Sequence, residues 1–535
     1  MFGLPTDRIK TSGLNELAKD PTFWAVWGVI GILIASRWPA LNIPYFWDEA
    51  WVYVPAVKAM AQNGPSMLPS VIPDDLSRGH PLLFHFLGGI WIKVFGAGFV
   101  SLHGFALTIS CCLLFAVYLL GRTFFSPIVG LFTAILLGIQ PVFQAQASMV
   151  LPEVMLALWS VLCVYHYLKG NAGGYIIFGA ALALTKETGL VLIGILGLWT
   201  LVDFLVIRKM RLLSWETIRP LLILSVPFGV VSAFFILQYA TLGWLFYPGH
   251  TDLLVKDFGV FEEKVIFFYR FLFEEQGRYV MTITLFTVCA CAGISKSKAI
   301  NLLYLVIPFL AILVYLEPKF LHKSLTVCLI LLMWLILMYR LWDLAKVYRF
   351  SATPILLIPL FILGYLAFSS ANFSTLRYLM SLFPFFLLLV VWGLEVSLMK
   401  FRWVFYLSIL IICGSVLFLS NGKDAISDCY PNYVDAVRLG EEVVHYLEHN
   451  NLYGQSLATS FIMGIYITQP SAGYRKTSKE FKRVYNYFAR EATYFLIGNM
   501  EPNAKALQYL NEKENITLVK RFEKGPGWFE LYKKE

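Results

Sequence analysis

Charged side chains are scarce in this chain. Of its 535 residues only 14% are Asp, Glu, Lys or Arg, whereas 58% are hydrophobic and 16% are aromatic. A water-soluble protein of this length needs a more polar surface than this composition provides. The scarcity of charge therefore excludes a string of soluble domains and indicates a surface that faces lipid.

A cleavage site and a cysteine framework are also missing. The first twenty residues mix both charge signs and contain no small-residue cleavage site, so the apolar run at 23–36 is expected to be an uncleaved first span. Seven of the eight cysteines lie inside apolar runs, where a thiol behaves as a small hydrophobe, and only Cys429 is expected to be exposed. This spacing fits neither a disulfide framework nor a zinc site. The sequence requires no cofactor and leaves a divalent cation open.

No single basic face is present, although the net charge is +9. The Lys and Arg residues stand in short clusters between apolar runs, without the interleaved aromatic residues of a nucleic-acid site. We therefore expect membrane lipids among the partners and no nucleic acid.

Long apolar runs are what the chain has in abundance. A hydrocarbon core about 30 Å thick needs roughly 20 apolar helical residues, and about thirteen runs meet this need. They are centred near Gly31, Leu113, Ala134, Leu158, Gly179, Ile195, Pro227, Leu285, Ile307, Leu332, Leu360, Leu387 and Ile411. The chain is therefore expected to be an all-α, multi-pass membrane protein.

Basic residues in the connections give the spans a direction. The connections on the N-terminal side carry Lys or Arg throughout, from Arg122 and Lys169 to Lys400 and Arg402. By the positive-inside rule this side, and with it the N-terminus, is cytoplasmic. An odd number of spans then places the C-terminal segment outside the cell, on the plasma membrane or, in a bacterium, the inner membrane.

Two domains are expected from the change in composition along the chain. Residues 1–421 form the transmembrane domain, with 42–103 as its first external loop, and residues 422–535 form a small extracytoplasmic α/β domain. In this second domain helix patterns cover 436–448 and 504–511, and strand patterns cover 493–497, 517–522 and 528–532.

Charges are absent from the apolar centres of the predicted spans. A proton- or ion-coupled transporter commonly needs such groups near the midplane, so this absence disfavours a transporter. The ionisable residues gather instead at the predicted outer ends of the spans. They are Asp48, Glu49, Arg78, His80, Glu153, Lys186, Glu187 and Arg377.

The pair Asp48 and Glu49 follows the first span and precedes an apolar helix pattern at 50–61, which predicts a helix lying in the membrane interface. Gly64 would end this helix, and Pro55 predicts either a kink or a helix start just before it. Adjacent carboxylates on a helix point about 100° apart, so the two need not share a role. The plainer explanation is that both acids stabilise a helix N-terminus.

The cations at the outer ends allow two interpretations each. Arg78 and His80 precede Pro81, which predicts a helix N-terminus suited to a phosphate, but a lone interfacial Arg also reaches lipid headgroups. Lys186 either meets an anion or reaches the interface in the same way. Arg377 can bind a phosphate with two hydrogen bonds or anchor its span.

In their order and spacing these segments resemble the polyprenyl-phosphate-dependent glycosyltransferases of the C-type membrane fold, in particular protein O-mannosyltransferases and lipid A aminoarabinose transferases. The resemblance covers residues 44–189 and the stretch 377–384. It is carried by Asp48-Glu49 with Tyr53, His80-Pro81-Leu82, Val94-Phe95-Gly96, Pro152-Glu153, Thr185-Lys186 and Arg377-Tyr378. Two positions depart from the family pattern: Glu153 stands where many relatives have Asp, and Leu82 where many have a second Pro.

The resemblance implies an inverting hexosyl- or pentosyltransferase that uses a polyprenyl-phosphate sugar donor. It assigns the catalytic carboxylates to Asp48, as the base, and Glu49. Substrate binding is assigned to Arg78, His80, Glu153, Lys186, Glu187, Arg377 and Tyr378. The acceptor hydroxyl would belong to a protein, a lipid or a glycan.

Two alternatives stay open from the sequence. One is a flippase or transporter for lipid-linked glycans, which would need cations at both leaflets or along a groove. The other is a non-catalytic member of the same fold that binds a glycan.

Overall fold

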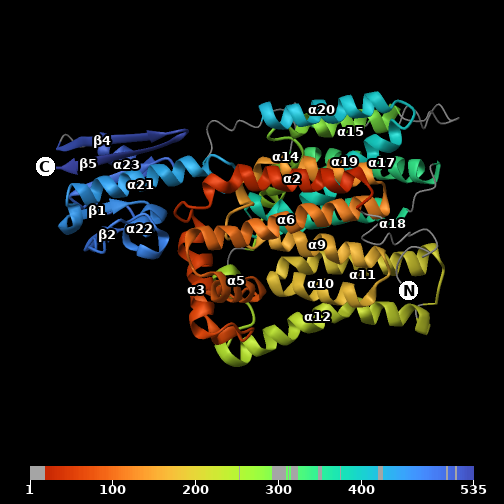
Figure 1. Cartoon of the computed structure of the whole chain (residues 1–535), viewed down its shortest axis with the longest axis horizontal. Coiled ribbons are helices and arrows are strands. Elements are labelled where there is room, and N and C mark those ends of the chain that lie inside the picture. The colour runs from red at the N-terminus through yellow and green to blue at the C-terminus, as the bar shows by residue number, and fades with distance from the viewer. Residues whose placement is uncertain are drawn as a thin grey trace.

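The computed structural model describes residues 18–211, 213–251, 254–291, 306, 309–310, 312–314, 323–347, 352–373, 375–419, 426–501, 504–512 and 515–535. Long helices lie side by side in one bundle, and a smaller domain with a sheet stands at one end of it (Figure 1). The expectation of a mostly helical membrane protein with a small C-terminal α/β domain is confirmed.

Eight helices among the described residues are long and apolar enough to cross a membrane, as judged from length and composition. They contain α2 (Pro21–Arg37), α6 (Phe99–Phe124), α11 (Leu190–Val202, within the helical stretch Glu187–Ile207), α12 (Trp215–Leu242), α17 (Lys323–Val347), α18 (Ala352–Ala371), α19 (Phe383–Ser397, within the helical stretch Leu376–Ser397) and α20 (Arg402–Leu419). Shorter apolar helices are α5 (Leu83–Phe95), α7 (Pro127–Gly138), α9 (Glu153–Leu168), α10 (Ala172–Thr185) and α15 (Arg278–Cys291). Twelve of the thirteen predicted centres fall in helices, and the centre at Ile307 lies outside the described residues.

Helix α19 is the centre of the bundle. Every residue from Phe383 to Val396 is buried, as expected for a helix that is apolar on all sides. A short 3-10 helix, η7 (Leu376–Leu382), leads directly into α19. The fold thereby places Arg377, in η7, at the N-terminal end of α19, the most deeply buried helix.

The loop at 42–103 folds into short helices across the end of the bundle (Figure 1). A wide π turn, η3 (Glu49–Tyr53), runs into α3 (Val54–Asn63), and α4 (Asp74–Ser77) precedes α5. Helix α3 begins just before Pro55, where proline needs no amide donor, and it ends at Gly64 with a φ of 90°. Both expectations for this helix are confirmed.

The predicted helix start at Pro81 is wrong. Helix α5 begins at Leu83, and Arg78 instead ends α4 in a left-handed conformation with a φ of 50°. Gly79 follows with a φ of 73°, so two consecutive left-handed residues turn the chain away before α5 can start. At this position an anion could therefore meet the Arg78 side chain, but not the free amide groups of a helix N-terminus.

The C-terminal domain is built around a five-stranded sheet. In chain order its elements are α21 (Tyr433–His449), β1 (Ser456–Thr459), α22 (Phe461–Thr468), β2 (Arg483–Tyr485), β3 (Tyr494–Gly498), α23 (Ala504–Asn511), β4 (Ile516–Lys524) and β5 (Gly527–Lys534). The strand order is β2-β1-β3-β5-β4, with β1 parallel to β2 and β3, and β5 antiparallel to β3 and β4. The predicted helices and strands of this domain are confirmed, whereas β1, α22 and β2 were not anticipated. Between α20 and α21, Cys429 is 1% exposed, so its expected exposure is wrong.

The C-terminal domain docks on the loop at 42–103 through hydrogen bonds to the backbone of Tyr45. The Tyr45 amide donates to the Ala472 carbonyl at 3.1 Å, and the Tyr474 hydroxyl donates to the Tyr45 carbonyl at 3.1 Å. Between these residues Gly473 has a φ of 97°, and a Cβ at that position would overlap the ring of Phe99. Only glycine fits this contact without strain.

We expect Gly473→Ala to loosen the docking of the C-terminal domain. The left-handed backbone and the clash with Phe99 would cost about 1–3 kcal/mol of the free energy of unfolding. Thermal unfolding of the purified protein measures this loss. Gly454→Ala is the matched control because a Cβ there meets no atom within 4 Å. Equal melting temperatures for the two variants would contradict the account of the docking.

Candidate functional site

Arg377 is the centre of a buried cluster of charges. Its guanidinium donates hydrogen bonds to the carboxylates of Asp48 and Asp428, and its Nε lies 3.4 Å from Glu153 Oε1. The Arg377 side chain is 4% exposed. Because an unpaired buried charge is costly, the three carboxylates fix the position of the guanidinium.

Asp48 lies just before η3 and is held from two sides. Besides Arg377 it accepts a hydrogen bond from Trp51 Nε1 at 2.9 Å. Burial acts to raise the pKa of the Asp48 carboxyl, but Arg377, with help from Trp51 and Arg78, outweighs burial and holds that pKa below its usual value. The carboxylate therefore stays ionised, and its side chain keeps 17% of its surface exposed.

Lys186 and Glu153 extend the cluster. Lys186 follows α10 and its Nζ lies 3.3 Å from Glu153 Oε1, at the N-terminus of α9. The same ammonium group lies 3.4 Å from the centre of the Tyr378 ring. Lys186 is thus directed inward and does not extend to the membrane surface.

Glu49 faces away from Asp48 and holds the loop. Its Oε2 accepts from the Phe46 amide at 3.0 Å, and its Oε1 accepts from the Val150 amide at 2.6 Å. His103 Nε2 lies 3.5 Å from Oε1, and Glu49 is 1% exposed. The structure therefore separates the two adjacent carboxylates, as their spacing on a helix suggests.

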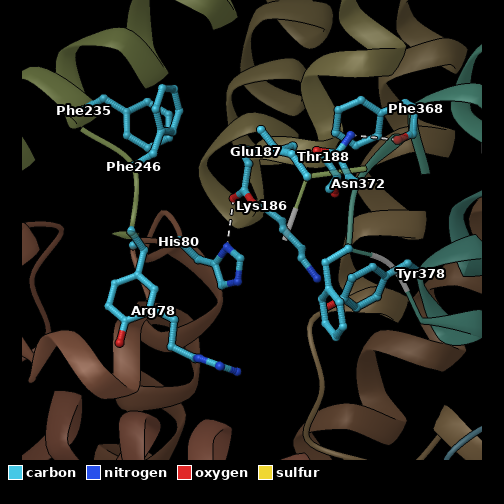
Figure 2. Close-up of a pocket in the computed structure, with 14 residues that line it drawn as sticks. Arg78, His80, Lys186, Glu187, Thr188, Phe235, Phe246, Phe368, Asn372 and Tyr378 are labelled. Atoms are coloured by element: carbon cyan, nitrogen blue, oxygen red, sulfur yellow. Dashed lines mark hydrogen bonds and ion pairs between the residues drawn. The ribbon is translucent and has the colours of Figure 1, made fainter. Parts of the chain in front are cut away.

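A cavity of about 340 Å³ opens beside the cluster. Figure 2 shows Arg78, His80 and Lys186 pointing toward its middle, with Phe235 and Phe246 on one side and Phe368 and Tyr378 on the other. His80 Nδ1 lies 2.9 Å from Glu187 Oε2, which orients the imidazole. The cavity thus joins an apolar region to a cationic one.

Arg78 connects this cavity to Asp48. Its guanidinium lies 5.0 Å from the centre of the Trp51 ring, and Trp51 donates to Asp48. Arg78 forms no ion pair with any residue in the described ranges. An anion in the cavity would therefore meet a cation that is not held in an ion pair, although it lies close enough to Asp48 to favour its ionised form.

The structure brings together the residues that the sequence placed at outer span ends. Asp48, Glu153, Lys186, Arg377 and Tyr378 form one contact network, and Arg78, His80 and Glu187 line the adjoining cavity. Asp428 and Trp51 were not predicted as site residues. Trp51 follows Asp48 by one helical turn, a spacing that predicts contact, whereas nothing in the sequence connects Asp428 with this site.

No group of three or more His, Cys, Asp or Glu side chains arranged to hold a metal ion occurs among the described residues. The carboxylates that gather here surround Arg377, whose positive charge occupies the place between them. The chemistry that this arrangement offers is a proton-accepting carboxylate next to an anion site.

We expect Glu49→Gln to destabilise the protein by about 1–3 kcal/mol, because an amide nitrogen cannot accept and leaves the Phe46 or Val150 amide unpaired. The free energy of unfolding, measured by thermal or denaturant titration, shows the loss. The control is Glu442→Gln on the exposed side of α21. A stability equal to that of the control would show that Glu49 does not hold the loop.

No protein-family model and no curated protein matches the chain. Solved structures resemble it at low identity. ArnT from Cupriavidus metallidurans in the apo state is 11% identical over 95% of this chain and 98% of its own, with a TM-score of 0.48. ArnT bound to undecaprenyl phosphate is 12% identical over 96% of this chain and 98% of its own, also with a TM-score of 0.48.

The archaeal oligosaccharyltransferase AglB from Archaeoglobus fulgidus, in complex with an inhibitory peptide and a dolichol-phosphate, is 14% identical. The match covers 87% of this chain and 65% of AglB, with a TM-score of 0.46. These neighbours agree with the family resemblance of the sequence. At such identities and scores they add no argument about function, which rests on the residues of the chain itself.

Proposed function

We propose that this chain is an inverting membrane glycosyltransferase. It moves a sugar from a polyprenyl-phosphate donor to an acceptor hydroxyl at the outer face of the membrane. The observation that carries the proposal is Asp48: an ionised carboxylate, held by Arg377, in a charge cluster whose Lys186 and Tyr378 line a cavity with both aromatic and cationic side chains.

The cavity suits a lipid phosphate. Phe235, Phe246 and Phe368 supply apolar surface for a prenyl chain, while Arg78 and Lys186 supply positive charge for the phosphate. Compensating the charge that develops on a leaving group is the largest contribution that a protein usually makes to such a reaction. Arg377 acts differently from the other two cations, because three carboxylates engage its guanidinium, whereas Lys186 pairs with one, Glu153.

The reaction needs one proton acceptor and one leaving group. As the acceptor oxygen forms its bond to the anomeric carbon, Asp48 takes the hydroxyl proton, and the bond from that carbon to the phosphate oxygen breaks. The electron pair stays on the phosphate, whose charge is balanced by Arg78 and Lys186. Attack opposite the leaving group inverts the anomeric centre. Arg377 positions Asp48, and Asp428 and Glu153 position Arg377.

A second candidate function, a flippase, has one observation in its favour. A cavity of about 460 Å³ lies at the start of α10, the end opposite to Lys186, and is lined by Arg208 and Arg219. Cations therefore stand at both ends of the bundle. Transfer by the purified protein in detergent, where no second leaflet exists, distinguishes the two: an enzyme forms product and a flippase does not.

We expect Asp48→Asn to lower kcat for sugar transfer by about 10²- to 10⁴-fold, the usual contribution of a general base. Product formation by the purified protein is the measurement, with thermal unfolding to show that the variant folds. Asp75→Asn, an exposed acid of the same loop, is the control. Undiminished transfer by a folded Asp48→Asn protein would show that Asp48 is not the general base.

We expect Arg377→Gln to move the acid limb of the pH–rate profile to higher pH. A carboxylate accepts a proton only when ionised, so the rate falls as the pH drops through its pKa. Burial raises the pKa of Asp48 and Arg377 lowers it, so without Arg377 burial dominates. The profile of the residual activity tests this, with Arg402→Gln, at the exposed start of α20, as control. An acid limb at the same pH in both variants would mean that Asp48 is not the titrating base.

A further inference from the structure

A second cavity, of about 200 Å³, lies in the C-terminal domain. It is formed where the parallel strands β1 and β3 end, between the start of α22 and the segment after β2. The carboxyl ends of parallel strands are a usual place for a ligand, because the connections diverge there. The proposed glycosyl transfer does not use this cavity.

The lining combines aromatic rings with uncharged polar groups. Tyr487 is 59% exposed and Phe461 is 37% exposed, so both rings are accessible at the cavity. The Ser460 hydroxyl oxygen is buried and has no hydrogen-bond partner in the part of the chain that the structure describes. The Asn486 side chain is exposed at the same cavity and offers both a donor and an acceptor.

The one carboxylate of the cavity is already used. Glu501 accepts from the Phe461 amide at 3.2 Å and from the Ile462 amide at 2.7 Å, at the N-terminus of α22. The groups left for a ligand are therefore neutral hydroxyl and amide groups beside aromatic rings. Such a lining fits a neutral, hydroxyl-rich ring with an apolar face, which is the chemistry of a sugar.

Phe461 links this cavity to the proposed reaction centre. Its ring meets the ring of Trp51 edge to face, with 5.1 Å between the ring centres. Trp51 Nε1 in turn donates to Asp48 Oδ1 at 2.9 Å. One aromatic side chain therefore separates the second cavity from the carboxylate.

We propose that this cavity binds one sugar of a glycan acceptor, so that a neighbouring sugar of the same glycan extends past Trp51 and presents its hydroxyl to Asp48. The proposal rests on the glycosyltransferase function proposed above and selects glycan from the open acceptor classes. It also requires an acceptor longer than one sugar. A glycan is favoured over a peptide strand, because the cavity lies across the strand ends and not along the edge strand β2, where a peptide could add as a further strand.

Binding is tested without any donor. The full-length protein is placed in lipid nanodiscs, since glycoside detergents would compete. Saturation-transfer NMR is recorded with a panel of methyl glycosides of the common hexoses, N-acetylhexosamines and pentoses. At least one member should bind. Tyr487→Ala and Asn486→Ala should each weaken its binding about tenfold, as for loss of an anchoring contact. The control Asn450→Ala, an exposed asparagine at the end of α21, should leave the affinity unchanged.

The proposal is overturned if no member of the panel binds, or if both cavity variants bind as tightly as the control. An unstructured peptide that displaces the bound glycoside would overturn it in favour of a peptide acceptor. Asp48→Asn should keep the glycoside affinity of the unaltered protein. If the unaltered protein binds the glycoside but transfers no sugar, the glycosyltransferase proposal fails. If the cavity variants lose glycoside binding but transfer sugar as the unaltered protein does, the acceptor-site proposal fails.

Discussion

The arrangement of this protein depends on one buried guanidinium. Arg377 is 4% exposed and would be unstable at that depth without carboxylates around it. Asp48 comes from the loop at 42–103, Glu153 from the start of α9 and Asp428 from the segment that leads into the C-terminal domain. A single charge thus ties together the bundle, the loop and the segment before the C-terminal domain.

This constraint explains how an ionised carboxylate is kept next to an apolar cavity. The three carboxylates exceed the charges of Arg377 and Lys186 by one, so the cluster keeps a negative charge that can accept a proton. Arg78 lies on the ring of Trp51, outside the ion pairs of the cluster, and remains available to an anion. The proton acceptor and the anion site are therefore adjacent, and Arg78 helps keep Asp48 ionised.

Much of the fold was predictable from the sequence, because long apolar runs report directly on helices. The gathering of Asp48, Glu153, Lys186 and Arg377 followed from placing span ends on one face. The contact between Asp428 and Arg377 could not be predicted, because Asp428 lies in a polar stretch without periodicity, 51 positions from its partner. The strands β1 and β2, of four and three residues, were too short for a pattern, and with them the second cavity was missed. The prediction of a helix start at Pro81 was wrong because two consecutive left-handed residues cannot be recognised in the sequence when the first is an arginine.

Consumption of a lipid-phosphate sugar by this chain is tested by mass spectrometry of the lipids and glycans of cells with and without the gene. We expect cells that lack the gene to accumulate a polyprenyl-phosphate sugar and to lose one glycosylated product, which would name the donor and the acceptor together. An unchanged lipid and glycan profile would show that the chain does not consume such a donor.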